Sequence, residues 1–99
     1  MAFPSFYARL LTGLSHPRRI KIINTLLNQP APITHGNLQA LLNFNAQAMT
    51  HHLGQMEKAG LIQRTPKGRE THISLQSDAL LKCIHDIDRQ CRYPKLRAA

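Results

Sequence analysis

The sequence lacks the marks of membrane, secreted and disulfide-stabilised proteins. No apolar run approaches the roughly 20 residues that a transmembrane helix needs. The opening segment, MAFPSFYARL, has no charged stretch followed by an apolar one, as a secretory signal would have. Two cysteines, Cys83 and Cys91, are too few for a disulfide framework. We therefore expect a cytosolic protein with no membrane partner.

Acidic residues are also scarce, since 5 Asp and Glu stand against 13 Lys and Arg and the formal net charge is +8. This excess favours a polyanionic partner, nucleic acid before an anionic membrane. No Lys, Arg, Asp or Glu lies between Lys21 and Glu57. A basic membrane-surface helix would concentrate its charge on one segment, whereas here the basic residues flank an uncharged middle. All of them except Arg9 and Lys82 form three groups: Arg18, Arg19 and Lys21; Lys58, Arg64, Lys67 and Arg69; and Arg89, Arg92, Lys95 and Arg97.

Catalytic groups show no recognisable arrangement. The five carboxylates are scattered, and no serine–histidine or cysteine–histidine pair stands out by its spacing. A chain of 99 residues supports one domain, residues 1–99, with little room for a cleft. We therefore expect a protein that is not an enzyme and has no cofactor. A domain this small buries only part of its surface, which favours a homodimer.

Apolar spacings of three and four residues predict five helices, over residues 3–14, 15–27, 34–42, 45–60 and 77–92. We expect Ser15, Thr34, Asn45 and Ser77 to be N-caps and Gly60 to end the fourth helix, while Pro94 stops the last one. The predicted buried faces of the last four helices are Ile20, Ile23, Leu26 and Leu27; Leu38, Leu41 and Leu42; Met49, Leu53 and Met56; and Leu80, Ile84, Ile87 and Cys91.

Two strands, Leu61–Thr65 and Glu70–Leu75, are predicted around a turn at Pro66-Lys67-Gly68-Arg69. The chain is therefore mainly α with a small β-hairpin, in the order α-α-α-α-β-β-α. A tight turn at Asn43–Asn45 joins the third and fourth helices into a helix-turn-helix over residues 34–60. In such a motif the second helix enters the DNA major groove by its N-terminal residues.

The fourth helix has a polar face opposite its predicted buried stripe. At about 100° per residue, Gln47 and His51 lie on the outer side, with Ala48, Thr50 and Gln55 on its flanks. Gln can pair with adenine, Thr offers a hydroxyl and a methyl, and His can donate to guanine or phosphate. The basic hairpin tip is placed to reach phosphates or the minor groove. The predicted DNA-binding residues are Gln47, Ala48, Thr50, His51, Gln55, Lys67 and Arg69, whereas His52 is expected to be a packing residue.

Three segments resemble the arsenic-repressor-like (ArsR/SmtB-type) family of winged helix-turn-helix regulators, and the resemblance covers roughly residues 10–77. The segments are His16-Pro17-Arg18-Arg19-Ile20, Gln47-Ala48-Met49-Thr50-His51-His52-Leu53 with Glu57-Lys58-Ala59-Gly60-Leu61-Ile62, and His72-Ile73-Ser74-Leu75. The resemblance implies a wing over residues 61–75 and a dimer built from the first and last helices, the latter spanning 77–92. It further implies binding to an inverted-repeat operator, usually as a repressor.

The sequence departs from the metal-sensing members of that family. Thr34-His35-Gly36-Asn37-Leu38 holds no cysteine pair, and the last helix offers only His85 with Asp88, short of the four ligands that zinc takes. We therefore expect no metal. Cys83 and Cys91 are about 12 Å apart along one helix and cannot bridge within it. A bridge between subunits stays open, although a cytosolic location disfavours it.

Two other binding functions stay open. The N-terminal half of the fourth helix has no Arg or Lys, which leaves room for sequence-neutral packaging of DNA or RNA. A winged helix used for protein–protein contact would present an apolar or acidic face, and Lys67, Arg69 and Gln47 argue against it. The operator, the existence of an effector and the choice between repression and activation are not readable from the residues.

Overall fold

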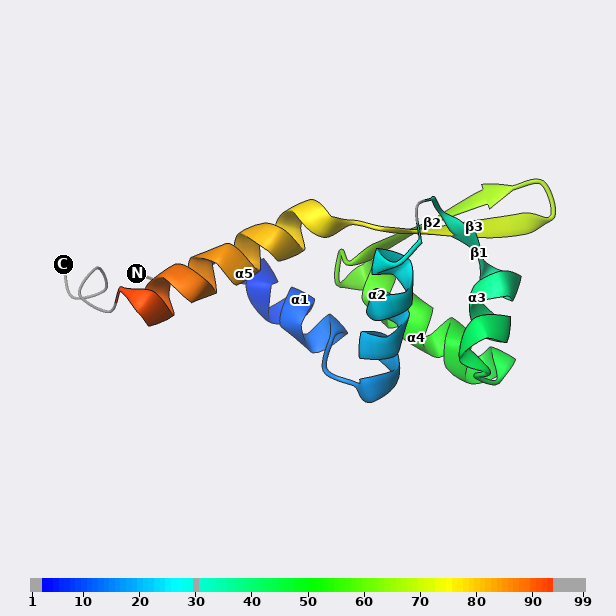
Figure 1. Ribbon diagram of the computed structural model, residues 1–99, viewed down its shortest axis with the longest axis horizontal. Coiled ribbons are helices and arrows are strands. Elements are labelled where there is room, and N and C mark those ends of the chain that lie inside the picture. The colour runs from blue at the N-terminus through cyan, green and yellow to red at the C-terminus, as the bar shows by residue number, and fades with distance from the viewer. Residues whose placement is uncertain (1–2, 30, 94–99) are drawn as a thin grey trace.

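The computed structural model describes residues 3–29 and 31–93, so Pro94, Lys95 and Arg97 lie outside the described residues. The elements are α1 (Phe6–Gly13), α2 (Pro17–Leu27), β1 (Ile33–Thr34), α3 (His35–Leu42), α4 (Ala46–Lys58), β2 (Ile62–Lys67), β3 (Glu70–Leu75) and α5 (Ser77–Arg92). Figure 1 shows α5 extending to one end of the molecule and the hairpin β2–β3 to the other, with α1 to α4 beneath them. The predicted helical order is confirmed. In the described part of the chain, no helix has the length and apolar character needed to cross a membrane.

The sheet has three antiparallel strands in the order β1-β3-β2, one more than predicted. β1 is only two residues long and pairs Ile33 with Ile73, so it carries no readable alternation. The predicted four-residue hairpin turn is also wrong, because Lys67 pairs with Glu70 and leaves a two-residue turn. Gly68 has φ 64° there, a value that glycine adopts without strain.

Helix starts follow local hydrogen bonds, and two of the four predicted N-caps are confirmed. The Thr34 hydroxyl accepts from the Asn37 N–H at 3.1 Å, and the Asn45 side chain accepts from the Ala48 N–H at 2.7 Å. Ser15 is not a cap. Its hydroxyl donates to the Thr12 carbonyl, and His16 caps α2 instead because Pro17 occupies the first helical position. Likewise Gln76, not Ser77, precedes α5, without a side-chain cap bond.

The core lies where α1, α2 and α4 meet the sheet and α5. Met49, Leu53 and Met56 are fully buried, which confirms the predicted stripe of α4. The predicted faces of the other helices are partly wrong. Exposed residues that were expected inside are Ile20, Leu27, Leu41, Ile84 and Cys91, while Ile22 and Cys83 are fully buried. Each of these helices turns a neighbouring stripe toward the core, which apolar spacing alone does not distinguish.

Two contacts fix α1 on the rest of the fold. A Cβ added at Gly13 would lie 2.6 Å from the Ala59 Cβ and 2.7 Å from the Leu61 Cδ1, so only glycine permits this approach. At the other side of α1, the Tyr7 hydroxyl donates to the Asp86 carboxylate of α5. The Gly13 contact holds α1 against the C-terminal end of α4, whereas the candidate site lies at the N-terminal end of α4.

Candidate nucleic-acid interface

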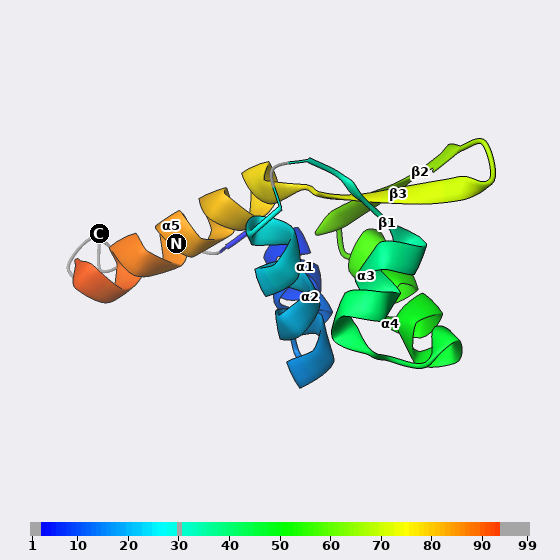
Figure 2. The same ribbon diagram turned by 45° about the vertical axis from the view of Figure 1, so that its right-hand side comes forward.

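The candidate interface is built on α3, the tight turn and α4. Asn43 ends α3 in the left-handed conformation, with φ 55°, and Asn45 caps α4 two residues later. The chain reverses within this turn, so α4 begins at Ala46 and Gln47 stands in its first turn. Figure 2 shows α3 and α4 together at the end of the molecule from which the hairpin β2–β3 projects. α3, this turn and α4 together form a helix-turn-helix.

The predicted site residues differ in exposure. Gln47, Thr50 and His51 are exposed on α4, whereas Ala48 and Gln55 are half-buried. Lys67 and Arg69 are exposed at the end of the hairpin. The first turns of α4 therefore offer polar groups to solvent while Met49 and Leu53 hold the opposite face in the core.

A groove joins the N-terminal ends of α2 and α4. It brings together three of the predicted residues, Gln47, Ala48 and His51, and adds side chains that the prediction did not include; its full lining is His16, Arg18, Arg19, Asn45, Gln47, Ala48, His51 and His52. Thr50, Gln55, Lys67 and Arg69 lie outside the groove. The residues of α2 form the second side of this groove. The basic group at residues 18–21 was the sequence feature that indicated them.

His52 is a buried side chain that lines that groove. It is 5% exposed, its Nδ1 accepts a hydrogen bond from Arg19 Nε at 3.1 Å, and its ring centroid lies 4.5 Å from that of His16. Burial lowers the pKa of His52, and the nearby His16, Arg19, His51 and Arg18 lower it further. The interpretation of His52 as a packing residue is confirmed. Among the described residues, no group of three or more His, Cys, Asp or Glu side chains is arranged to hold a metal ion.

Arg18 is held against the turn between α3 and α4. Its guanidinium carbon lies 5.3 Å from the centroid of the Phe44 ring, within the range of a cation–π contact. Phe44 in turn packs on the buried core that contains Met49. This contact sets a cation of α2 beside the start of α4.

One cation of the hairpin, Arg64, is neutralised by Glu57. The Glu57 carboxylate accepts from the Arg64 backbone N–H at 3.1 Å and from two guanidinium nitrogens at 3.1 and 2.8 Å. The side-chain hydrogen bond from Arg64 is the main reason that the pKa of Glu57 is lowered. Arg64 therefore ties the hairpin to the end of α4, and Lys67 and Arg69 are left as the exposed cations of the hairpin.

Comparisons with known proteins agree with this geometry. A family model described as a helix-turn-helix domain matches residues 14–65. The chain is 30% identical over 73 residues to the HTH-type transcriptional regulator YgaV of Escherichia coli (strain K12). The matched segment covers 74% of this chain and 73% of that protein. The structure of HlyU from Vibrio vulnificus CMCP6 is similar with a TM-score of 0.64 and 26% identity, over 81% of this chain and 84% of that one. An ArsR-like transcriptional regulator from Rhodococcus sp. RHA1 has a TM-score of 0.79 and 23% identity, over 95% and 87%.

Proposed function

Since the chain belongs to the helix-turn-helix domain family and has the winged-helix fold of ArsR-type transcriptional regulators, we propose that it binds an inverted-repeat DNA operator as a homodimeric repressor. A DNA-binding transcriptional regulator is the general function of this family. Beyond this general function, we propose a symmetric operator, a dimer, repression as the direction of regulation, and the residues that read DNA. It treats residues 1–99 as one domain with its wing at 61–75.

The observation that carries the proposal is the exposed polar start of α4, backed by a fully buried stripe. Gln47, Thr50 and His51 are free to enter a major groove while Met49 and Leu53 anchor the helix. The Gln47 amide suits adenine, the Thr50 side chain suits a hydroxyl or methyl contact, and His51 suits guanine or a phosphate. Ala48 and Gln55, on the flanks, complete the proposed reading surface.

Phosphate contacts come from the exposed cations around α4. Lys67 and Arg69 at the hairpin end grip the flanking backbone or minor groove, and Arg18 stands beside the start of α4. These contacts position the protein without reading sequence. Arg64 is not among them, because Glu57 neutralises it.

The dimer rests on apolar side chains that the single chain leaves exposed. On α5, Leu81, Ile84 and Cys91 are exposed along a stripe next to the one that packs on the core. On α1, Leu11 is 45% exposed. A two-fold partner would cover these residues with the same residues of its own, as an isologous interface requires.

Selection of binding sites from a random double-stranded DNA pool at near-physiological salt tests the proposal. We expect an inverted repeat with half-sites about one helical turn apart. Gln47→Ala should relax preference at one position of each half-site, costing about 1–3 kcal/mol there, whereas Lys67→Ala should weaken all sequences alike. Tight binding with no enriched sequence would favour the packaging alternative, and unchanged preference in Gln47→Ala would remove Gln47 from the reading surface.

The dimer and the direction of regulation need their own measurements. Sedimentation equilibrium should give twice the chain mass, and Ile84→Glu should shift the protein toward monomer while Lys82→Glu, a control on the same helix, should not. When the selected site is placed within the promoter of a reporter gene, expression of the protein should lower transcription from that promoter. A monomer at micromolar concentration would contradict the dimer, and increased transcription would contradict repression.

A further inference from the structure

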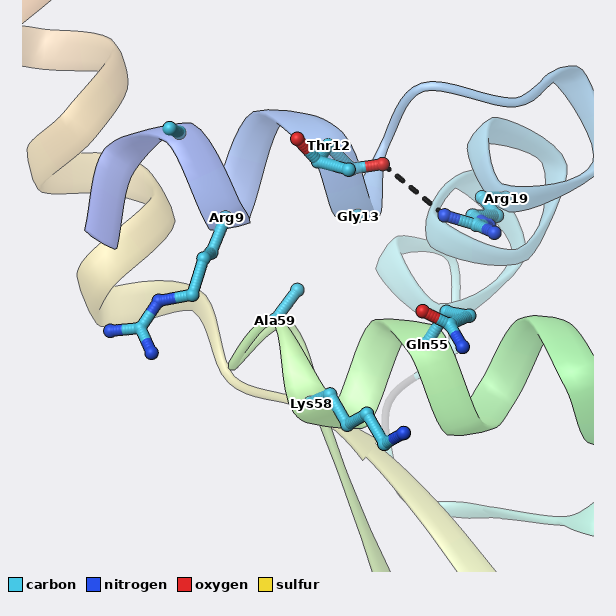
Figure 3. Close-up of a pocket in the computed structure, with 8 residues that line it drawn as sticks. Arg9, Thr12, Gly13, Arg19, Gln55, Lys58 and Ala59 are labelled. Atoms are coloured by element: carbon cyan, nitrogen blue, oxygen red, sulfur yellow. Dashed lines mark hydrogen bonds between the residues drawn. The ribbon is translucent and has the colours of Figure 1, made fainter. Parts of the chain in front are cut away.

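A second pocket, which shares Arg19 with the groove, lies where α1, α2 and the C-terminal half of α4 meet (Figure 3). Its volume is about 240 Å³. Arg9 reaches it from α1, Arg19 from α2 and Lys58 from α4, while Thr12 and Gln55 supply neutral polar groups. Figure 3 shows Arg19 above Gln55 on one side of the pocket, while Arg9 extends from α1 on the other side of Ala59 and Lys58 lies below it. The pocket was not predicted, because its three cations are far apart in the sequence.

The charge of this pocket is of one sign. No carboxylate lines it, and within the described part of the chain neither the Arg9 nor the Lys58 side chain has a hydrogen-bond or ion-pair partner. All three charged residues that line the pocket are cationic, so the electrostatic potential in it is positive. The pocket therefore favours a negatively charged occupant.

Arg19 is held in place for such an occupant. Its Nη1 donates to the Thr12 carbonyl at 3.2 Å, and its Nε donates to His52 Nδ1 at 3.1 Å. These two bonds orient the planar guanidinium, and its other N–H groups have no partner among the described residues. A guanidinium fixed in this way matches the oxygens of a carboxylate or a phosphate.

One wall of the pocket is closely packed, and its space is small. Gly13 packs directly on Ala59 and Leu61, which fixes the distance between α1 and α4. Ala8, Gly13 and Ala59 provide an apolar lining beside the cations. A volume of about 240 Å³ is below that of pockets for drug-sized ligands, so only a small group fits.

We infer that this pocket binds an oxyanion of the carboxylate or phosphate type, supplied by a free small molecule or by a phosphodiester of the DNA backbone. Lys58 and Gln55 belong to α4, and Arg19 joins the pocket to His52 in the groove. The occupant is therefore in contact with the helix that reads DNA. This link to DNA rests on the proposed function, whereas binding of the anion does not.

The first experiment uses the full chain without DNA. Inorganic phosphate is titrated at constant ionic strength while two-dimensional amide NMR spectra are recorded for wild type, Arg9→Gln and Arg89→Gln. Arg89→Gln removes the same charge from the exposed surface of α5 and is the matched control. We expect saturable shifts at Thr12, Gly13 and Ala59 in wild type and in the control, with affinity about tenfold lower in Arg9→Gln, because one positive charge beside the anion is removed.

The second experiment distinguishes the two sources of the anion. The affinity for the selected DNA is measured against salt for the same three proteins. A slope lowered by about 1 in Arg9→Gln but not in Arg89→Gln assigns the pocket to a backbone phosphate. The pocket is assigned to a free anion if two results are found together. The salt slopes of the proteins are equal, and added phosphate changes the DNA affinity of wild type but not of Arg9→Gln.

The inference is overturned if phosphate shifts are absent or equal in Arg9→Gln and Arg89→Gln and their DNA salt slopes also agree. That result would leave the DNA-binding proposal intact. Conversely, a protein that selects no DNA sequence but binds phosphate through Arg9 would retain the pocket and lose the proposed operator.

Discussion

Arg19 Nε in α2 donates a hydrogen bond to His52 Nδ1 in α4 across 3.1 Å. The bond joins the two helices through residues that are 33 positions apart in the sequence. The bond needs a lone pair on Nδ1, so it exists only while the His52 ring is neutral. The same guanidinium lines both the groove at the start of α4 and the second pocket, where α1, α2 and α4 meet. Protonation of one buried ring would therefore disturb both sites.

Acidification should destabilise the protein through His52. Burial, followed by the charges of His16, Arg19, His51 and Arg18, lowers the pKa of His52 from 6.5 in the folded state. The unfolded chain then binds the proton more readily, so this contribution is complete above about pH 6.5 and is lost as pH falls toward the lowered value. Urea unfolding at about pH 7.5 and pH 5.5 should show a smaller decrease in His52→Asn than in wild type. Equal decreases would show that His52 does not carry the effect.

Glu57→Gln should weaken the link between α4 and the hairpin. The neutral amide loses the charge of a carboxylate that accepts three hydrogen bonds from Arg64. Both side chains are partly exposed, so we expect the free energy of unfolding to fall by only about 1 kcal/mol. The released Arg64 should steepen the salt dependence of DNA binding. Asp88→Asn, which breaks the exposed pair with Arg92 on α5, is the control and should leave that salt dependence almost unchanged.

Gly13→Ala should be strongly destabilising. The added Cβ would lie 2.6 Å from the Ala59 Cβ and 2.7 Å from the Leu61 Cδ1, and separating α1 from α4 disrupts a buried contact. We expect a loss of about 1–3 kcal/mol in chemical denaturation. Gly54→Ala is the matched control, because Gly54 lies within α4 and nothing stands within 4 Å of its new Cβ. That variant should be neutral or more stable by up to about 1 kcal/mol, and equal losses in both would contradict the close approach.

Tyr7→Phe should loosen α1 from α5. The Tyr7 hydroxyl donates to the Asp86 carboxylate, and this bond is the main cause that raises the pKa of Tyr7 to about 12. Removing the hydroxyl leaves the ring in the core but deprives Asp86 of its partner, so we expect the melting temperature to fall by about 5 °C. Tyr93→Phe should leave it unchanged, since Tyr93 is 57% exposed. If the two variants melt alike, the Tyr7–Asp86 bond contributes nothing.

Much of the helix-turn-helix was readable from the residues, because its determinants are local. The caps at Thr34 and Asn45 bond to N–H groups three positions along, and Gly60 ends α4 with φ 85°. The buried stripe of α4 follows from its three- and four-residue spacing. The exposed positions of Gln47 and His51 followed in turn, since they lie opposite that stripe.

The sequence by itself therefore determined the order of the helices, the caps that start α3 and α4, and the outward polar face of α4. The tertiary structure alone decided which stripe of α2, α3 and α5 is buried, that β1 joins the sheet, and that Glu57 neutralises Arg64. It also brought Arg9, Arg19 and Lys58 around one pocket. The physical reason is range: caps and turns act within a few residues, whereas burial and charge pairing depend on which distant segments meet in space.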